Sequence, residues 1–378
     1  MSRQLAYQAI SIPAVLVTAG LAAGLVASPG AGVRDRAERP VAADTGARPL
    51  YESFATALFR DAAQHGSGNV FVSPVSAGVA LGMAYGGARG QTREAMGRTL
   101  GFGAMAPESV AAANARLLAS LRDQKDVRLL IANALWAQQG VPLSPEYIAD
   151  TRRDFGADAE TVDFGSRAAV DAINGWASRS TEGKIPAILA APPDPRPVLM
   201  LTNAVYFKGQ WAAKFDSTQT QLRGFTRLDR SGVQHKMMTR TGEYAVRMIT
   251  SPDRIAVLRM PYAGNRFSMY LLLPDSGAGL AGAYRALETA PWQTPGVRTQ
   301  VHVVLPRFTI RTDLRLNDAL KRLGMAGAFS DGADFSGMMA ASGGGPGRHF
   351  AISDVRQATY IDVSEEGTEA AAVTSIGI

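Results

Sequence analysis

Hydrophobic positions along the chain follow two periods, and the change between them separates an early helical part from a later part rich in strands. From Tyr51 onward, apolar residues recur at the spacing of one helix face. Asp126–Gln138 and Pro197–Gly209 are instead nearly continuous apolar runs, the pattern of central strands covered on both faces. Helices early and strands late, without regular strand–helix alternation, predict an α+β fold with large mixed sheets.

Several element ends are marked by helix-capping and turn residues. Ser73 precedes Pro74, so we expect a short strand and then a helix that Ser73 caps and Gly86–Gly87 end. Gly264–Asn265 separates two apolar runs, which predicts a hairpin turn. A further helix is expected over Leu314–Leu323, before Gly324.

The N-terminus has the features of an export signal. Arg3 precedes the apolar stretch Ala9–Ala27, and small residues follow at Ser28–Gly32, where a signal peptidase could cut. The alternative is a retained membrane anchor, since the stretch is marginally long enough to span a bilayer. We therefore expect a signal peptide over 1–32, a flexible spacer over 33–49 and one domain over 50–378. The expected location is secreted, with no stable membrane association after cleavage.

Composition narrows the picture further. Of 378 residues, 46% are hydrophobic and 19% are charged, which is enough apolar surface for a sizeable core. The net charge of +6 comes from scattered basic residues rather than a dense patch, so no nucleic-acid partner is expected. The absence of cysteine excludes disulfides, thiol catalysis and cysteine-based metal sites. An exported, arginine-rich chain without disulfides suggests a bacterial source.

Motifs of enzymes are missing. The chain has four histidines, none in an H-E-x-x-H arrangement or paired at metal-ligand spacing. It has neither a G-x-S-x-G nucleophile elbow nor a phosphate-binding P-loop. We therefore expect no catalytic residue, metal or cofactor, and a protein that is not an enzyme.

The C-terminal stretch "EEGTEAAAVTSIGI", Glu365–Ile378, is made almost entirely of small residues. As a strand with period 2, it would place Thr368, Ala370 and Ala372 on an uncharged face and Glu369 on the other. The segment could therefore bury one face in a sheet and remain soluble when exposed. A frayed tail or a helix fits this composition equally well.

The stretch "EEGTEAAAVTS" resembles the hinge of the reactive loop of serpins, the serine protease inhibitor superfamily. Further resemblances follow in the family's order: "NVFVSPVSAGVALGMAYGGARGQT", "INGWASRSTEGKI", "LTNAVYFKGQWAAKF", "VLRMPYAGNRFSMYLLLPD", "LPRFTI" and "GADFSGM". Together they cover about Leu50–Ile378.

The resemblance implies a serpin fold, with helices packed around three mixed β-sheets and an exposed reactive loop following a central-sheet strand. It implies a monomeric suicide substrate: a protease attacks the loop, which then inserts into a five-stranded central sheet. The target would be a serine protease or a papain-like cysteine protease. The alternatives are a non-inhibitory serpin-fold binding protein and an inactive truncated serpin.

The resemblance also assigns residues. Trp211 matches the tryptophan where the loop first enters the sheet, although ordinary core packing would also explain it. Ser73 could equally be a helix cap, and Asn203 a satisfied buried amide. The expected hinge comprises Glu365, Glu366, Gly367, Thr368, Glu369, Ala370, Ala371 and Ala372, and the expected sheet-opening network Ser73, Ser76, Asn203 and Gln357. Gln357 stands where the family often has histidine, and it can still donate and accept hydrogen bonds.

The end of the chain departs from the family. The scissile bond would lie a few residues beyond Ile378, and the core strands that follow it in serpins are absent. We therefore expect a form that lacks the C-terminal segment and that does not inhibit by itself.

Overall fold

The structure is a computed structural model of the chain. It describes residues 15–18 and 50–377, apart from gaps at 67, 122–126, 195–198, 228, 276–278, 290–293, 295, 341–350 and 353. Of the expected signal peptide, only residues 15–18 are described, and the expected spacer over 33–49 lies outside the described residues. Within the described part, none of the helices combines the length and the apolar character needed to cross a membrane.

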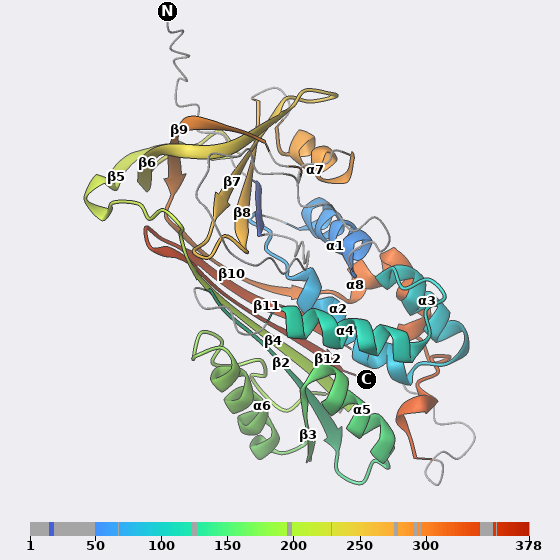
Figure 1. Cartoon of the computed structure of the whole chain (residues 1–378). Coiled ribbons are helices and arrows are strands. Elements are labelled where there is room, and N and C mark those ends of the chain that lie inside the picture. The colour runs from blue at the N-terminus through green and yellow to red at the C-terminus, as the bar shows by residue number, and fades with distance from the viewer. Residues whose placement is uncertain are drawn as a thin grey trace, which may run out of the picture.

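A six-stranded central sheet is the largest feature of the fold (Figure 1). Neighbouring strands pair antiparallel, except that β2 and β3 are parallel. In spatial order the strands are β10 (Phe308–Arg315), β11 (Asp354–Val363), β12 (Gly367–Gly377), β4 (Leu199–Gln210), β2 (Val127–Gln138) and β3 (Ala157–Val162).

The apolar run of β2 is explained by cores on both faces of the sheet. Leu135 and Ala137 belong to a core shared with the N-terminal helices. Ala134 and Trp136 point the other way, into a second core where the Trp136 ring packs edge-on against Trp176 of α6 (Arg167–Ser180). Because successive strand residues alternate between faces, a strand covered on both sides has no polar side to show.

A second sheet lies next to the central one and branches at its long strand β6 (Gly232–Ile249). One end of β6 pairs with β5, the middle with β9 and the other end with β7. The two branches of this sheet share β6. If they are counted as two sheets, the fold has the three sheets expected. Its other strands are β1 (Val15–Thr18), β5 (Gln221–Thr226), β7 (Ile255–Pro261), β8 (Ser268–Pro274) and β9 (Val297–Pro306).

Helices cover both faces of the central sheet. Figure 1 shows α1 to α4 together on one side of it, α6 on the other, and α7 beside the branched sheet. The remaining helices are α1 (Glu52–His65), α2 (Pro74–Gly87), α3 (Gly90–Leu100), α4 (Pro107–Leu121), α5 (Pro145–Phe155), α7 (Gly279–Thr289) and α8 (Asn317–Leu320), with short helical turns η1 (Ser217–Gln219), η2 (Lys321–Met325), η3 (Ala326–Phe329) and η4 (Ser336–Met338).

Local sequence patterns located some of these elements. The Gly264–Asn265 pair forms the β7–β8 turn with φ of 76° and 57°, the left-handed values that favour these two residue types. The expected helix over Leu314–Leu323 begins too early, because Leu314 and Arg315 still pair with β11 and the helix starts at Asn317. The short strand expected before Ser73 is also wrong, since the chain there forms none.

The largest difference concerns the reactive loop. The segment expected to be exposed above a five-stranded sheet is β12, which lies inside the sheet between β11 and β4. The other strands of the sheet number five, as expected for the sheet without the loop, so the structure shows the loop-inserted arrangement. Insertion satisfies backbone donors and acceptors along both sides of the segment, which a loop in solvent leaves to water.

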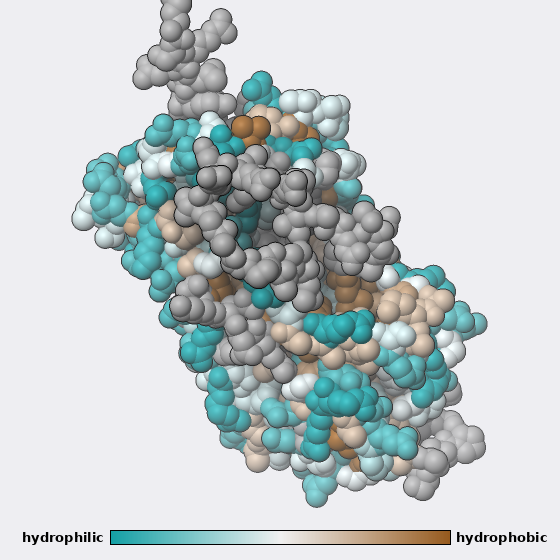
Figure 2. Space-filling view, viewed as in Figure 1, coloured by the Kyte–Doolittle hydropathy of each residue, from teal (hydrophilic) through white to brown (hydrophobic). Residues whose placement is uncertain are grey.

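In the view of Figure 2, brown hydrophobic areas are small and are separated by hydrophilic ones. The most exposed large apolar residues of the described part are Leu222 and Val297, at 66% and 78%.

Candidate functional site: the hinge of the inserted strand

The turn that joins β11 to β12 has to pass very close to the end of β4. Ser364 closes it by donating its backbone N–H to the carbonyl of Gly367, at 2.9 Å. A Cβ atom on Gly367 would lie 2.0 Å from the backbone oxygen of Gly209. Only glycine fits this approach, so the residue type at 367 is fixed by the backbone of β4.

Trp211 holds the turn from the side of β4. Its backbone N–H donates to the carbonyl of Glu366 and its indole Nε1–H to the carbonyl of Ser364, both at 2.9 Å. The indole is 2% exposed, so these two bonds are made in a dry environment. Trp211 therefore does more than fill the core, because both of its N–H groups bind the backbone of the hinge.

Thr368, the first inward residue of β12, meets a buried aromatic cluster. The Tyr262 hydroxyl donates to Thr368 Oγ1 at 2.8 Å, and the threonine is only 2% exposed. The Tyr262 ring stacks on Trp211, with centroids 4.7 Å apart, and meets Phe207 edge-on. Burial raises the pKa of Tyr262 and the Thr368 bond lowers it less, so the hydroxyl keeps its proton and acts as the donor.

Glu365 fixes the turn to three other elements. Its carbonyl accepts from Phe215 N–H at 3.0 Å, and its carboxylate accepts from Thr220 Oγ1 at 2.8 Å. Arg307 Nη1 lies 3.8 Å from the other carboxylate oxygen. Burial raises the pKa of Glu365. Hydrogen bonds from its own backbone and from Thr220, together with the positive charges of Arg307 and Lys236, lower the pKa by more, so the net shift is downward.

The next residue, Glu366, has the opposite environment. Its side chain is 70% exposed and pairs with Lys214 at the surface, where Nζ and Oε2 are 2.6 Å apart. The two consecutive carboxylates thus differ in environment: that of Glu365 points into the molecule, and that of Glu366 points into solvent.

Gln357 and Ser73 form the central contact of the expected sheet-opening network. Gln357 is fully buried; its Oε1 accepts from the backbone N–H of Ser73 at 2.7 Å and its Nε2 donates to the Ser73 carbonyl at 2.9 Å. The Ser73 side chain makes no capping bond, so the expected cap is wrong, although Pro74 does begin α2. Gln357 instead binds the backbone N–H and carbonyl of Ser73 itself, the residue before the first helical position.

The other two members of that network are less fully described. Ser76 is completely buried in α2. The backbone of Asn203 pairs with Asn133 on β2 and with Thr374 on β12, while its side chain lies outside the described residues. Beside them, the Thr359 hydroxyl donates to the Phe71 carbonyl at 3.2 Å.

The structure therefore brings Glu365 to Thr368 together with Trp211, and Ser73 together with Gln357. Glu369 and Ala370 to Ala372 continue β12 in register with β11 and β4, and their side chains lie outside the described residues. Sequence reasoning missed Tyr262, Thr220 and Arg307, which contact the hinge from more than 50 residues away in the sequence. No local pattern marks them.

With this geometry established, comparison with known proteins identifies the family. A family model described as Serpin (serine protease inhibitor) matches residues 49–378. The chain therefore belongs to the serpin family of serine protease inhibitors.

Individual relatives agree. Iripin-8 of Ixodes ricinus is 37% identical over 325 residues, covering 82% of this chain and 77% of the relative. Human leukocyte elastase inhibitor is 35% identical, covering 82% and 83%. These and other animal relatives lend no support to the expected bacterial source or to the expected missing C-terminal segment, and both stay predictions.

Solved structures with the same fold include loop-cleaved forms. A structure described as cleaved Serpin 42Da has a TM-score of 0.79 at 28% identity and covers 87% of this chain and 88% of its own. Reactive-loop-cleaved human thyroxine-binding globulin has a TM-score of 0.79 at 26% identity, covering 87% and 97%.

The Tyr262–Thr368 bond should stabilise the inserted structure. We expect Tyr262→Phe to lower the free energy of unfolding by about 1–2 kcal/mol, because it leaves Thr368 Oγ1 buried without this donor. The measurement is urea unfolding followed by circular dichroism. Tyr244→Phe is the matched control, since Tyr244 is also buried in this core, but its hydroxyl accepts from Arg240 instead of donating to Thr368. Equal losses in the two variants would contradict a special role for the Thr368 contact.

Glu365 should make stability depend on pH. Its pKa is lower in the folded chain than in the unfolded one, so its contribution is present above the unfolded pKa and is lost as pH falls through the folded pKa. We expect Glu365→Gln to lower the melting temperature at neutral pH and to match the wild type at acidic pH.

The exposed neighbour Glu366→Gln is the control for this titration. It should change the melting temperature little at any pH, because its ion pair lies at the surface. A Glu365→Gln deficit that stays constant from neutral to acidic pH would contradict the assignment, since the effect would then not arise from ionisation.

Proposed function

We propose that the protein inhibits a serine protease irreversibly, as a suicide substrate whose cleaved loop becomes β12. The observation that carries this proposal is the seating of the hinge: Gly367 fits against Gly209, and Thr368 is buried against Tyr262. The sheet thus offers a preformed place for the strand that an inhibitory serpin must insert.

The reaction follows from acyl-transfer chemistry. The protease serine attacks the scissile carbonyl of the loop, the peptide nitrogen leaves with a proton, and the loop remains bound as an ester. Water would normally hydrolyse that ester. Insertion competes with this step by moving the ester-linked protease along the sheet; the 11 residues of β12 at about 3.3 Å each correspond to roughly 36 Å.

The composition of the hinge suits rapid insertion. Ala370 to Ala372 and Thr368 are small, so the strand can enter between β11 and β4 without displacing large side chains. A bulky or charged residue facing inward would have to be desolvated during the move. An inhibitor must insert before deacylation, so this composition favours inhibition.

A second candidate is a serpin-fold binding protein that does not inhibit. It is favoured by the similarity to thyroxine-binding globulin, which binds a thyroxine derivative in one of the solved structures. The small, uncharged residues Thr368 and Ala370 to Ala372 of the hinge are the feature against it.

Further properties belong to the same proposal. The N-terminal apolar stretch supports export and cleavage near Ser28–Gly32, hence action outside the cell. We also infer a monomer, and a target that is a serine protease in preference to a cysteine protease, because the family description names the former.

The decisive experiment uses the protein expressed from its complete gene, incubated with a panel of serine and papain-like cysteine proteases. We expect a protease–inhibitor complex that survives denaturing, reducing gel electrophoresis, because the acyl bond is covalent. An active-site-blocked protease is the control and should form none. Clean loop cleavage without any covalent complex across the panel would refute inhibition and favour the binding protein.

Thr368→Arg should convert the inhibitor into a substrate. The arginine would bring an unpaired charge into the site beside Tyr262, at a cost of several kcal/mol. A few kcal/mol on the insertion barrier slows it by orders of magnitude, so hydrolysis of the ester should win. The readout is the ratio of covalent complex to cleaved product.

The matched control is Thr226→Arg, the same change at an exposed position of β5. It should leave the ratio at the wild-type value. If Thr368→Arg also leaves the ratio unchanged, burial of Thr368 has no part in the inhibitory step.

A further inference from the structure

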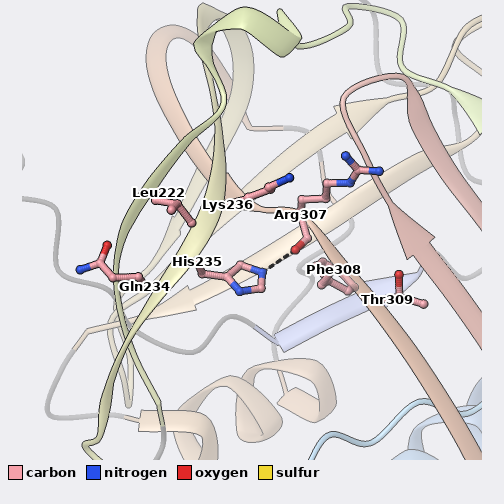
Figure 3. A pocket seen from close by; sticks show the side chains of 7 residues that line it. All are labelled: Leu222, Gln234, His235, Lys236, Arg307, Phe308 and Thr309. Carbon is pink, nitrogen blue, oxygen red and sulfur yellow. Dashed lines mark hydrogen bonds between the residues drawn. The ribbon is translucent and has the colours of Figure 1, made fainter.

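An open cavity of about 340 Å³ lies between the β5–β6 hairpin and the start of β10 (Figure 3). Its size is within the range of small-molecule sites. It is lined by Leu222, Gln234, His235, Lys236, Arg307, Phe308 and Thr309. None of these residues belongs to the hinge itself, but Arg307 connects the cavity to it through Glu365.

The lining has an apolar part and a cationic part. Leu222 of β5 is 66% exposed and Phe308 at the start of β10 is half-buried, and both line the cavity. Figure 3 shows the side chains of Lys236 and Arg307 extending on the same side of the cavity. A ligand that fills the space would therefore meet two apolar side chains as well as two positive charges.

The backbone that carries these groups is fixed. His235 Nε2 lies in hydrogen-bonding contact with the carbonyl of Arg307, the dashed line in Figure 3. The Arg307 N–H donates to the Lys236 carbonyl at 2.9 Å. Lys236 and Arg307 therefore lie on neighbouring stretches of chain whose backbones are hydrogen-bonded to each other. The distance between their backbones is fixed by this pairing.

Two carboxylates lie close to the cavity and must be weighed against the cations. Asp362 accepts from the Thr309 hydroxyl at 3.0 Å. Glu365 is 3.8 Å from Arg307, too long for a strong hydrogen bond, and the Arg307 side chain remains 46% exposed. Arg307 therefore keeps donors available to a second anion.

We propose that this cavity binds a small amphiphilic carboxylate, with its anionic group between Lys236 and Arg307 and its apolar body against Leu222 and Phe308. Arginine suits a carboxylate because its planar guanidinium can donate two parallel hydrogen bonds. The apolar body covers the exposed leucine. Neither half of such a ligand would suffice alone in a cavity this open.

The ligand competes with Glu365 for the same two cations. Lys236 and Arg307 both lower the pKa of Glu365, which shows that their charges act on that carboxylate. Bound ligand would weaken this hold on the turn before β12. Its influence on protease inhibition rests on the proposed function, whereas binding itself does not.

The experiment is isothermal titration calorimetry of the 378-residue chain with sodium octanoate, with octanol and acetate as comparison ligands. We expect saturable binding of octanoate and much weaker binding of either comparison ligand, because each carries only one half of the recognised chemistry. Lys236→Ala and Arg307→Ala should each weaken octanoate binding roughly tenfold, through loss of a charged hydrogen bond. Glu365→Gln should strengthen it several-fold by removing the competing carboxylate.

Arg298→Ala is the matched control. Arg298 is also an exposed arginine paired with a glutamate at 3.8 Å, but it does not line this cavity, so its loss should leave octanoate affinity unchanged. Octanol binding as tightly as octanoate, absence of saturable binding, or equal affinities in wild type, Lys236→Ala and Arg307→Ala would each overturn the site. Unchanged affinity in Glu365→Gln would overturn the competition. None of these outcomes involves a protease, so failure here leaves the inhibition assay to be judged separately.

Discussion

The close approach of Gly367 to Gly209 is the constraint on which the rest of the site depends. Strand β12 can pair with β4 along its whole length only if its first residue passes against the β4 backbone, where a Cβ would be 2.0 Å from a carbonyl oxygen. Once that contact is made, Thr368 turns inward to Tyr262, while Glu366, in the turn before the strand, reaches outward to Lys214. A single glycine thereby sets the register of eleven residues.

The environment of the entering strand is assembled from distant parts of the chain, and its parts reinforce one another. Trp211 binds the hinge backbone through both N–H groups and also supports Tyr262 by stacking. Tyr262 then supplies the hydroxyl for Thr368. Removing any of these side chains would disturb the others, because Trp211 and Tyr262 lie in one buried core and Thr368 is buried against Tyr262. The hinge is thus held by a polar backbone contact and an aromatic core that have to form together.

Features of the fold and the site that depend on residues close together in the sequence could be predicted, whereas contacts between distant residues could not. The apolar run of β2 and the Gly264–Asn265 turn were predicted, because strand burial and left-handed φ leave local patterns. The cap at Ser73 was not correctly predicted: its side chain makes no capping bond, and its backbone is bound by Gln357, 284 positions away. The family resemblance identified Trp211 and the hinge residues, but neither it nor the pattern could give Tyr262, whose partner is 106 positions away.

The position of the loop could not be predicted from local sequence patterns either. Small residues with one uncharged face are compatible both with exposure and with burial in a sheet, so the sequence 367–377 fits two arrangements of one chain. Which arrangement is favoured is decided by contacts that exist only after insertion: two backbone ladders, the Thr368 hydroxyl bond and the Glu365 carboxylate. Glu365 belongs to the turn and not to the inserting strand. Its carboxylate can therefore hold the start of the strand at neutral pH without itself entering the sheet. The charge thus lies in the turn, and the first inward residue, Thr368, is small and uncharged. This separates anchoring from movement, as a switch built on strand insertion requires.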